Sequence, residues 1–337
     1  MVKLFRSLLG NQRLLRELVL RDLKARYVGS SMGFFWSVIY PILNLFVYTF
    51  VFRVILSVRF GDRSSIKDVA IWMLAGIVVW AAFSETISRS TNCLVENANL
   101  IQKVVFPSAV LPLSLTISSL VNMLIGLPVV LMGVVFFGYI APSQGQIDAT
   151  EGPAPVAVAA FDPALEQPAP YSSSCDYCDY EHLLTCPNEG STLRIAAPKT
   201  AEDIVVKPRA LALGLALLWL PVLLLLQGIF TAGLGFFLAA FNLILRDTYH
   251  LVGVFVMVWM FSTPIFYPPE MVSGKGYGWI LDMNPMFWLI DSYREVLLFN
   301  HAPDFILLGK FGGAALFVLC LGGSFFQSQR DRFPDLL

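Results

Sequence analysis

The chain has 337 residues, of which 56% are hydrophobic and only 14% are charged. Soluble domains carry roughly a quarter charged residues, so this composition excludes an ordinary water-soluble domain and favours a membrane protein. The net charge of -1 says little about partners, because basic and acidic residues are concentrated in different parts of the chain.

Apolar segments recur along the chain at a length of about 20 residues, which is enough to cross a bilayer core of ~30 Å. The first begins too far from the N-terminus to be a cleavable signal peptide. The predicted spans are Phe34–Leu56, Val69–Thr91, Leu111–Ile140, Leu211–Ala240, Tyr249–Phe266 and Phe305–Phe326. We therefore expect an all-α polytopic membrane protein with six transmembrane helices.

Residues 1–33 form a basic arm, which the positive-inside rule places in the cytoplasm. Six spans return the C-terminus to the same side. Within the arm, Gln12–Tyr27 alternates leucine and arginine at helical spacing, which is typical of an amphipathic interfacial helix. The alternative is a basic tail that only sets topology. Arg59, Arg63 and Lys67, in the first outer loop, weakly oppose this orientation.

Two segments between spans are unusual. A stretch at about 93–106, within the unit 34–140 that carries spans one to three, starts polar and ends apolar. We expect it to lie at the membrane surface and contact a partner, although a solvated loop is the alternative. A second stretch at about 268–304, within the unit 210–337, predicts re-entrant helices in the outer leaflet. Its alternative is a surface amphipathic loop. Thr263-Pro264 should end the fifth span.

Residues 141–209 interrupt this pattern with an acidic, proline-rich insert. The interpretation is a small extracytoplasmic domain with a few short strands. Cys175, Cys178 and Cys186, with His182 between them, have the spacing of a zinc site. Cysteines outside the cytoplasm more often pair, so a disulfide is preferred, with zinc or free thiols as alternatives.

No catalytic constellation is present in the sequence. The chain lacks the G-x-x-x-x-G-K-[ST] pattern that cradles ATP phosphates, and its three histidines are far apart. No cofactor, metal or nucleic acid is expected to bind this chain.

Three further patterns concern the spans. Trp36, Tyr40 and Tyr48, with Asn44, recur at i, i+4 and form one stripe. The stripe could offer sugars a stacking surface in a channel, or it could be an interfacial aromatic belt. Glu85 and Arg89 are also i, i+4 and should pair near the inner end of the second span, as a functional pair or as a stabiliser of the helix end. Four glycines of the sixth span permit close helix approach: Gly312, Gly313, Gly322 and Gly323.

Three segments together resemble the permease subunits of ABC-2-type polysaccharide exporters, which move O-antigen, teichoic acid and capsular chains. The resemblance covers nearly the whole chain except the insert at 141–209. The insert departs from the family pattern, since members usually join the third and fourth spans by a short turn. The segments are Leu18–Trp36 running into Tyr40-Pro41, Asn99–Pro107 with Leu111-Pro112, and Asn284-Pro285 followed by Tyr293-Arg294-Glu295.

The resemblance implies two copies that form a channel in the bacterial inner membrane and recruit two separate ATPase subunits. ATP and magnesium would bind to those partners, and membrane lipids and a lipid-linked polysaccharide would contact this chain. The segment about 93–106 would be a coupling helix, and the arm would be a cytoplasmic gate. The implied ATPase contacts are Glu96, Asn97, Asn99, Gln102 and Lys103; the implied outer gate is Asn284, Pro285, Tyr293 and Arg294.

The function expected from this resemblance is export of a polysaccharide such as O-antigen. An ABC-2 exporter of a drug or small lipid is the nearest alternative. A secondary transporter would need paired acidic or broken-helix sites at midplane, for which Glu85 alone is thin support. A membrane-embedded transferase would need clustered acidic or histidine residues at a membrane face, and the sequence has none.

Overall fold

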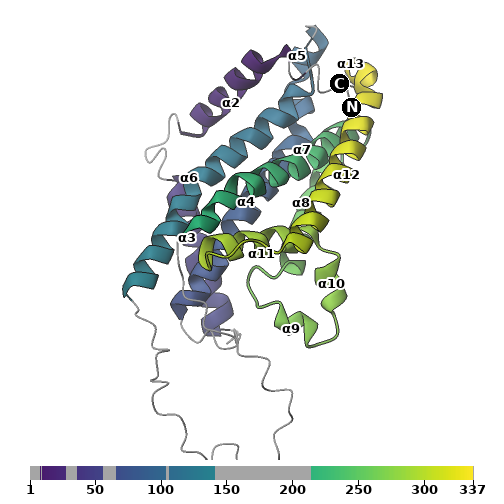
Figure 1. Cartoon of the computed structure of the whole chain (residues 1–337). Helices are drawn as coiled ribbons and strands as arrows, with labels where there is room; N and C mark the ends of the chain where they lie inside the picture. Colours follow the sequence, from purple (N-terminus) through teal and green to yellow (C-terminus); the bar gives the residue numbers. More distant parts are fainter. Residues whose placement is uncertain are drawn as a thin grey trace, which may run out of the picture. The chain divides into compact units, whose positions relative to one another are not determined.

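A computed structural model of the chain (Figure 1) describes residues 8, 10–27, 36–55, 66–103, 106–140 and 214–336. All regular structure within these ranges is helical. The insert at 141–209 lies outside the described residues, and with it lie the predicted strands and Cys175, Cys178 and Cys186.

Within the described ranges, four helices are long and apolar enough to cross a membrane. They confirm the predicted second, third, fourth and sixth spans as apolar helices, and they make the chain a multi-pass membrane protein. The helices are α4 (Ile66–Glu96), α6 (Val110–Ile140), α7 (Leu220–Ile244) preceded by the 3-10 turn η4 (Leu215–Trp219), and α12 (Phe305–Gln329).

The predicted first and fifth spans appear as shorter apolar helices. The first is α3 (Trp36–Thr49), extended by the π-helical turn η2 (Phe50–Ile55), and the fifth is α8 (Thr248–Ser262). Helix α8 ends directly before Thr263-Pro264, as expected, because a proline cannot donate the hydrogen bond that would continue the helix. Whether α3 and α8 cross the membrane stays a prediction.

Helix α4 lies at the centre of this helical unit. It packs against α3, α6, α7, α8 and α11, and 78% of its apolar window is buried, compared with 17% for α12. Large aromatic rings fill the space around it: Phe83 of α4 lies 6.0 Å from Phe230 of α7 and 5.2 Å from Trp259 of α8. Helix α4 is therefore enclosed by packed side chains over most of its apolar length.

The crossing of α7 and α12 is tight because two glycines meet there. A Cβ atom built on Gly322 would lie 2.9 Å from the carbonyl carbon of Gly233, and one built on Gly233 would lie 2.6 Å from the amide nitrogen of Leu319. A Cβ atom built on Gly313, by contrast, would have no other atom within 4 Å. Of these two glycines of α12, only Gly322 makes the close helix approach that was predicted.

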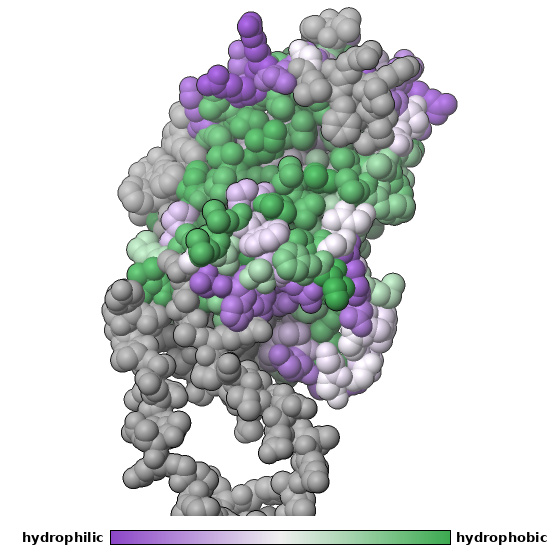
Figure 2. Space-filling view, viewed as in Figure 1, coloured by the Kyte–Doolittle hydropathy of each residue, from purple (hydrophilic) through white to green (hydrophobic). Residues whose placement is uncertain are grey.

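The two ends of the described chain share one apolar cluster. Leu18 of α2 (Gln12–Tyr27) and Phe333 of α13 (Phe333–Leu336) are both buried in it, together with Leu94 and Ile101. Figure 2 shows apolar residues over the middle of one face, with polar residues toward α2 and toward the short helices α9 (Glu270–Ser273) and α10 (Gly278–Asp282). An even number of crossings is consistent with both ends lying together.

Candidate functional site

The predicted coupling segment forms the reversal between α4 and α6. Its first residues, from Cys93 to Glu96, are the last turn of α4, and a separate short helix α5 (Ala98–Lys103) follows. Ile101 is buried in the cluster that also holds Phe333, whereas Asn99 and Gln102 are exposed. Helix α5 is therefore anchored on one side and accessible on the other.

The residues expected to contact an ATPase differ in their surroundings. Glu96 is exposed, and its carboxylate accepts a hydrogen bond from Asn92 Nδ2 at 2.9 Å. Asn97 is half-buried and donates to the carbonyl oxygen of Cys93 at 2.8 Å, which satisfies a terminal carbonyl of α4. Lys103 ends α5, but its side chain lies outside the described residues.

Four charged side chains join α2 to α4 next to this segment. The carboxylate of Asp22 accepts a hydrogen bond from Arg26 Nε at 3.1 Å, and both of its oxygens pair with the guanidinium of Arg89. Glu85 bonds Arg26 at 2.5 Å and Arg89 at 3.4 Å. The predicted Glu85–Arg89 pair is thus half of an alternating network, which we call the α2–α4 charge network.

Asp22 is held in its charged form. Burial raises the pKa of its carboxyl, but the hydrogen bonds and charge of Arg89, with the charge of Arg26, outweigh burial and lower the pKa below its ordinary value. A carboxyl with a lowered pKa in the folded state stabilises that state at neutral pH and loses the effect as the pH falls through the lowered value. The network is therefore intact at neutral pH.

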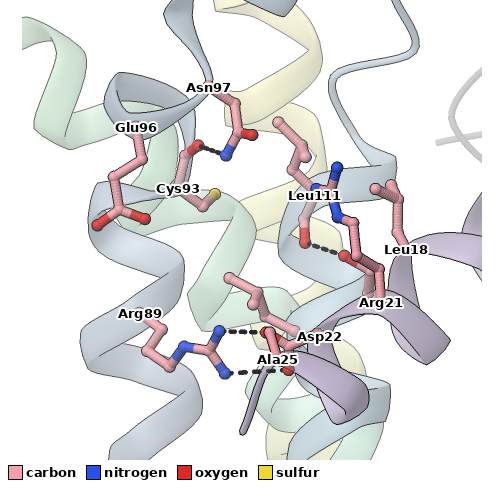
Figure 3. A pocket seen from close by; sticks show the side chains of 11 residues that line it. Leu18, Arg21, Asp22, Ala25, Arg89, Cys93, Glu96, Asn97 and Leu111 are labelled. Carbon is pink, nitrogen blue, oxygen red and sulfur yellow. Dashed lines mark hydrogen bonds and ion pairs between the residues drawn. The ribbon is translucent and has the colours of Figure 1, made fainter. Parts of the chain in front are cut away.

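A cavity of about 250 Å³ lies between α2, α4 and α6, above the charge network (Figure 3). Each helix contributes residues spaced three or four apart, so one stripe of each helix faces the cavity. The lining residues are Leu18, Arg21, Asp22 and Ala25 of α2, Arg89, Cys93, Glu96 and Asn97 around the end of α4, and Leu111, Ser114 and Leu115 of α6. Two predicted ATPase contacts, Glu96 and Asn97, are among them.

A second polar site lies in the predicted outer-gate segment, where both the oxygen and the nitrogen of the Asn284 side-chain amide form hydrogen bonds. Its Oδ1 accepts from the amide nitrogens of Met286 and Phe287, which caps α11 (Pro285–Leu298). The same oxygen accepts from Trp259 Nε1 at 2.9 Å, and Nδ2 donates to Thr263 Oγ1 at 2.9 Å. Asn284 thereby fixes the start of α11 to the end of α8.

Arg294 of α11 is 1% exposed and lies inside the protein. Its guanidinium donates to the carbonyl oxygens of Trp72 (3.4 Å), Pro264 (3.0 Å) and Ile265 (3.4 Å). It also lies 3.3 Å from the centroid of the Trp72 ring, a cation–π contact. Arg294 therefore joins α11 to α4 and to the non-helical segment after α8.

Tyr293 links the same helix to α7. Its hydroxyl donates to Gln227 Oε1 at 2.8 Å, and Gln227 Nε2 donates to the carbonyl oxygen of Val79 at 3.4 Å. The structure thus brings Asn284, Tyr293 and Arg294 together with α4, α7 and the end of α8. Pro285 occupies the first turn of α11, where its missing N–H costs nothing.

The predicted aromatic stripe lies on α3, but only part of it is described. The side chains of Trp36 and Tyr40 lie outside the described residues. The ring of Tyr48 is 4.2 Å from that of Phe266, which follows the broken end of α8, and Phe52 stacks on the same ring at 5.2 Å. At Tyr48, the stripe packs against the segment that Arg294 holds.

Sequence reasoning missed Asp22, Trp72 and Gln227. Asp22 is 67 positions from Arg89, and carbonyl partners such as that of Trp72 leave no trace in side-chain chemistry. Within the described ranges, no cluster of three or more His, Cys, Asp or Glu residues could hold a metal ion.

Comparison with known proteins shows which class of membrane protein the chain resembles. Residues 207–298 match the model of the ABC-2 type transporter family. The chain is also 25% identical to the O-antigen export system permease protein RfbA of Myxococcus xanthus over 99% of each chain. It is 24% identical to an O-antigen export system permease protein RfbA of Klebsiella pneumoniae over 94% of this chain and 92% of that one. These matches confirm the predicted resemblance to ABC-2-type polysaccharide export permeases.

Proposed function

We propose that this chain is the transmembrane permease subunit of an ATP-driven exporter that moves a lipid-linked polysaccharide such as O-antigen across the bacterial inner membrane. The observation that carries the proposal is the full-length match to a permease named for O-antigen export. Relatives with this name do not favour the drug, small-lipid or secondary-transporter alternatives.

The proposed assembly has two copies of this chain and two ATPase subunits. The chain has no phosphate-binding loop, so ATP and magnesium belong to the partner. Helix α5 supports the contact, because it is held by Ile101 yet exposes Asn99 and Gln102. With α2 and both termini in the cytoplasm, the basic residues of α2 accord with the positive-inside rule.

Polysaccharide would pass along the stripe of α3 and leave past α11. Aromatic rings such as that of Tyr48 offer apolar faces on which sugars can stack, and its contact with Phe266 connects the stripe to the outer-gate segment. In this proposal α9, α10 and α11 dip into the outer leaflet, and Asn284 and Arg294 hold their non-helical flanks against protein, as backbone at membrane depth requires.

The insert at 141–209 is proposed to lie outside the cytoplasm and to carry one disulfide among its cysteines. Labelling of its thiols before and after reduction tests this. Labelling that appears only after a reductant supports a disulfide, whereas thiols freed by a chelator alone would establish a metal site instead.

Co-purification of the tagged chain from its native membranes, followed by mass spectrometry, tests the function. Stoichiometric recovery of a subunit with a phosphate-binding loop is the expected result. A chain that is recovered alone in mild detergent, and is active without nucleotide, would refute the proposal. A tagged, unrelated multi-pass protein from the same membranes controls for nonspecific recovery.

A further inference from the structure

The cavity between α2, α4 and α6 has an apolar wall and a charged mouth. Leu18 and Leu111 are buried, and Leu115 is half-buried. Arg21 of α2 and Glu96 of α4 both line the cavity and are exposed. The cavity of about 250 Å³ is larger than the ~150 Å³ site that accommodates a benzene ring, so one large apolar side chain would fit.

The charges at this site divide into two that are satisfied and two that are open. Asp22 and Arg89 neutralise one another within the α2–α4 charge network. Among the described residues, Arg21 has no ion pair, and Glu96 contacts only the neutral amide of Asn92. Within the described part of the chain, the mouth therefore presents one cation from α2 and one anion from α4 that have no oppositely charged partner.

These features favour a protein as occupant over a lipid headgroup. Two cations and two anions line the cavity, so an anionic headgroup gains no net attraction. Glu96 lies two residues before the accessible helix α5, so a protein that covers α5 also reaches this mouth. Opposite open charges on two helices match a partner that carries the complementary pair.

We propose that the cavity receives one apolar side chain of the ATPase subunit, flanked by an acidic residue that pairs with Arg21 and a basic residue that pairs with Glu96. This inference rests on the proposed function. An ATPase seated in this way touches α2 and α4 together, immediately above the charge network. Contact with α5 alone would leave α2 untouched.

Filling the cavity from its mouth tests the proposal in the complete complex. Ala25 lines the cavity and is exposed, so Ala25→Trp blocks the mouth without burying new volume in the helical core. Leu20→Trp is the matched control, because Leu20 is exposed on the same helix and does not line the cavity. Ala25→Trp and Glu96→Lys should each reduce ATPase recovered with the tagged chain by about tenfold or more, or ~1.4 kcal/mol.

The outcomes separate the two proposals. If the wild-type chain recovers ATPase, and Ala25→Trp and Glu96→Lys recover as much of it as the wild type does, the cavity proposal is wrong and the permease function stands. If the wild-type chain recovers none, the proposed function fails, and the cavity proposal fails with it. Unchanged recovery with Leu20→Trp is required for support, and a loss equal to that of Ala25→Trp would overturn the proposal.

Crosslinking does not depend on how the tryptophan variant folds. A small aliphatic diazirine amino acid, which is too short to block the mouth as tryptophan does, replaces Ala25 in the chain purified with its ATPase from membranes, and the adduct formed by light is identified by mass spectrometry. An adduct with an ATPase peptide, absent when the same group replaces Leu20, supports the proposal. Adducts with phospholipid alone would overturn it and assign the cavity to a headgroup.

Discussion

Replacing Gly322 by alanine should separate α7 from α12. The added Cβ would overlap the carbonyl oxygen of Gly233 and lie 2.9 Å from its carbonyl carbon, whereas ordinary contact begins at 3.4 Å, so the helices must move apart by well over 0.5 Å there. Backbone is the obstacle, and no side chain can rotate away. Overpacking of this kind costs ~1–3 kcal/mol, and it also loosens nearby contacts such as Phe236 with Phe326, whose centroids lie 5.4 Å apart.

Gly313→Ala is the matched control on the same helix, because nothing lies within 4 Å of its added Cβ. Alanine is the better helix former by ~1 kcal/mol, so this variant should be as stable as the wild type or more so. Thermal unfolding of the purified chain in one detergent measures both. Equal midpoints for the two variants would show that the α7–α12 crossing yields easily, and the packing argument would be wrong.

Three further perturbations address the polar sites. Asp22→Asn should release α2 and expose the buried thiol of Cys93 to thiol reagents, which peptide mass spectrometry measures; unchanged labelling would count against docking of α2 by charge. Because the Asp22 pKa is lowered in the folded state, the stability of the wild type should also fall below about pH 4 more steeply than that of the variant. Asn284→Ala should cost ~1 kcal/mol or more and abolish export, whereas Asp304→Ala, which removes the α12 cap to Ile306, should cost a similar amount and leave export intact. Arg294 uses a different nitrogen for each of its three carbonyl contacts. Arg294→Lys keeps three donors but places them on one nitrogen, which cannot reach all three carbonyls. Export should therefore be lost while ATPase recovery persists; normal export would make Arg294 dispensable for the outer gate.

Hydrophobic length predicted the long helices well, because ~20 apolar residues have few other solutions in a chain with so little charge. The Thr263-Pro264 pair predicted where α8 ends, since a proline lacks the N–H group that would continue the helix. Residue spacing predicted that Glu85 and Arg89 would pair. Spacing could not supply Asp22 and Arg26, because pairing between distant segments depends on how α2 packs against α6 and α4.

The outer site was predictable only as a set of residues. Resemblance singled out Asn284 and Arg294, but their partners are mostly backbone carbonyls and amides, which every residue carries. Gly313 and Gly322 are alike in sequence, and only the crossing of α12 with Gly233 distinguishes them. Such roles follow from which helices meet, and a single sequence does not specify those contacts.

The α2–α4 charge network also bears on how the chain enters the membrane during synthesis. Glu85 and Arg89 lie toward the C-terminal end of the otherwise apolar α4. A charged residue costs ~2.5–3.5 kcal/mol on insertion scales at the centre of a span and less near its end. Asp22 and Arg26 lie earlier in the chain than α4, so they leave the ribosome first and are already present when α4 is synthesised. The arm can then act as an intramolecular escort that neutralises the charges of α4 as this helix is released into lipid.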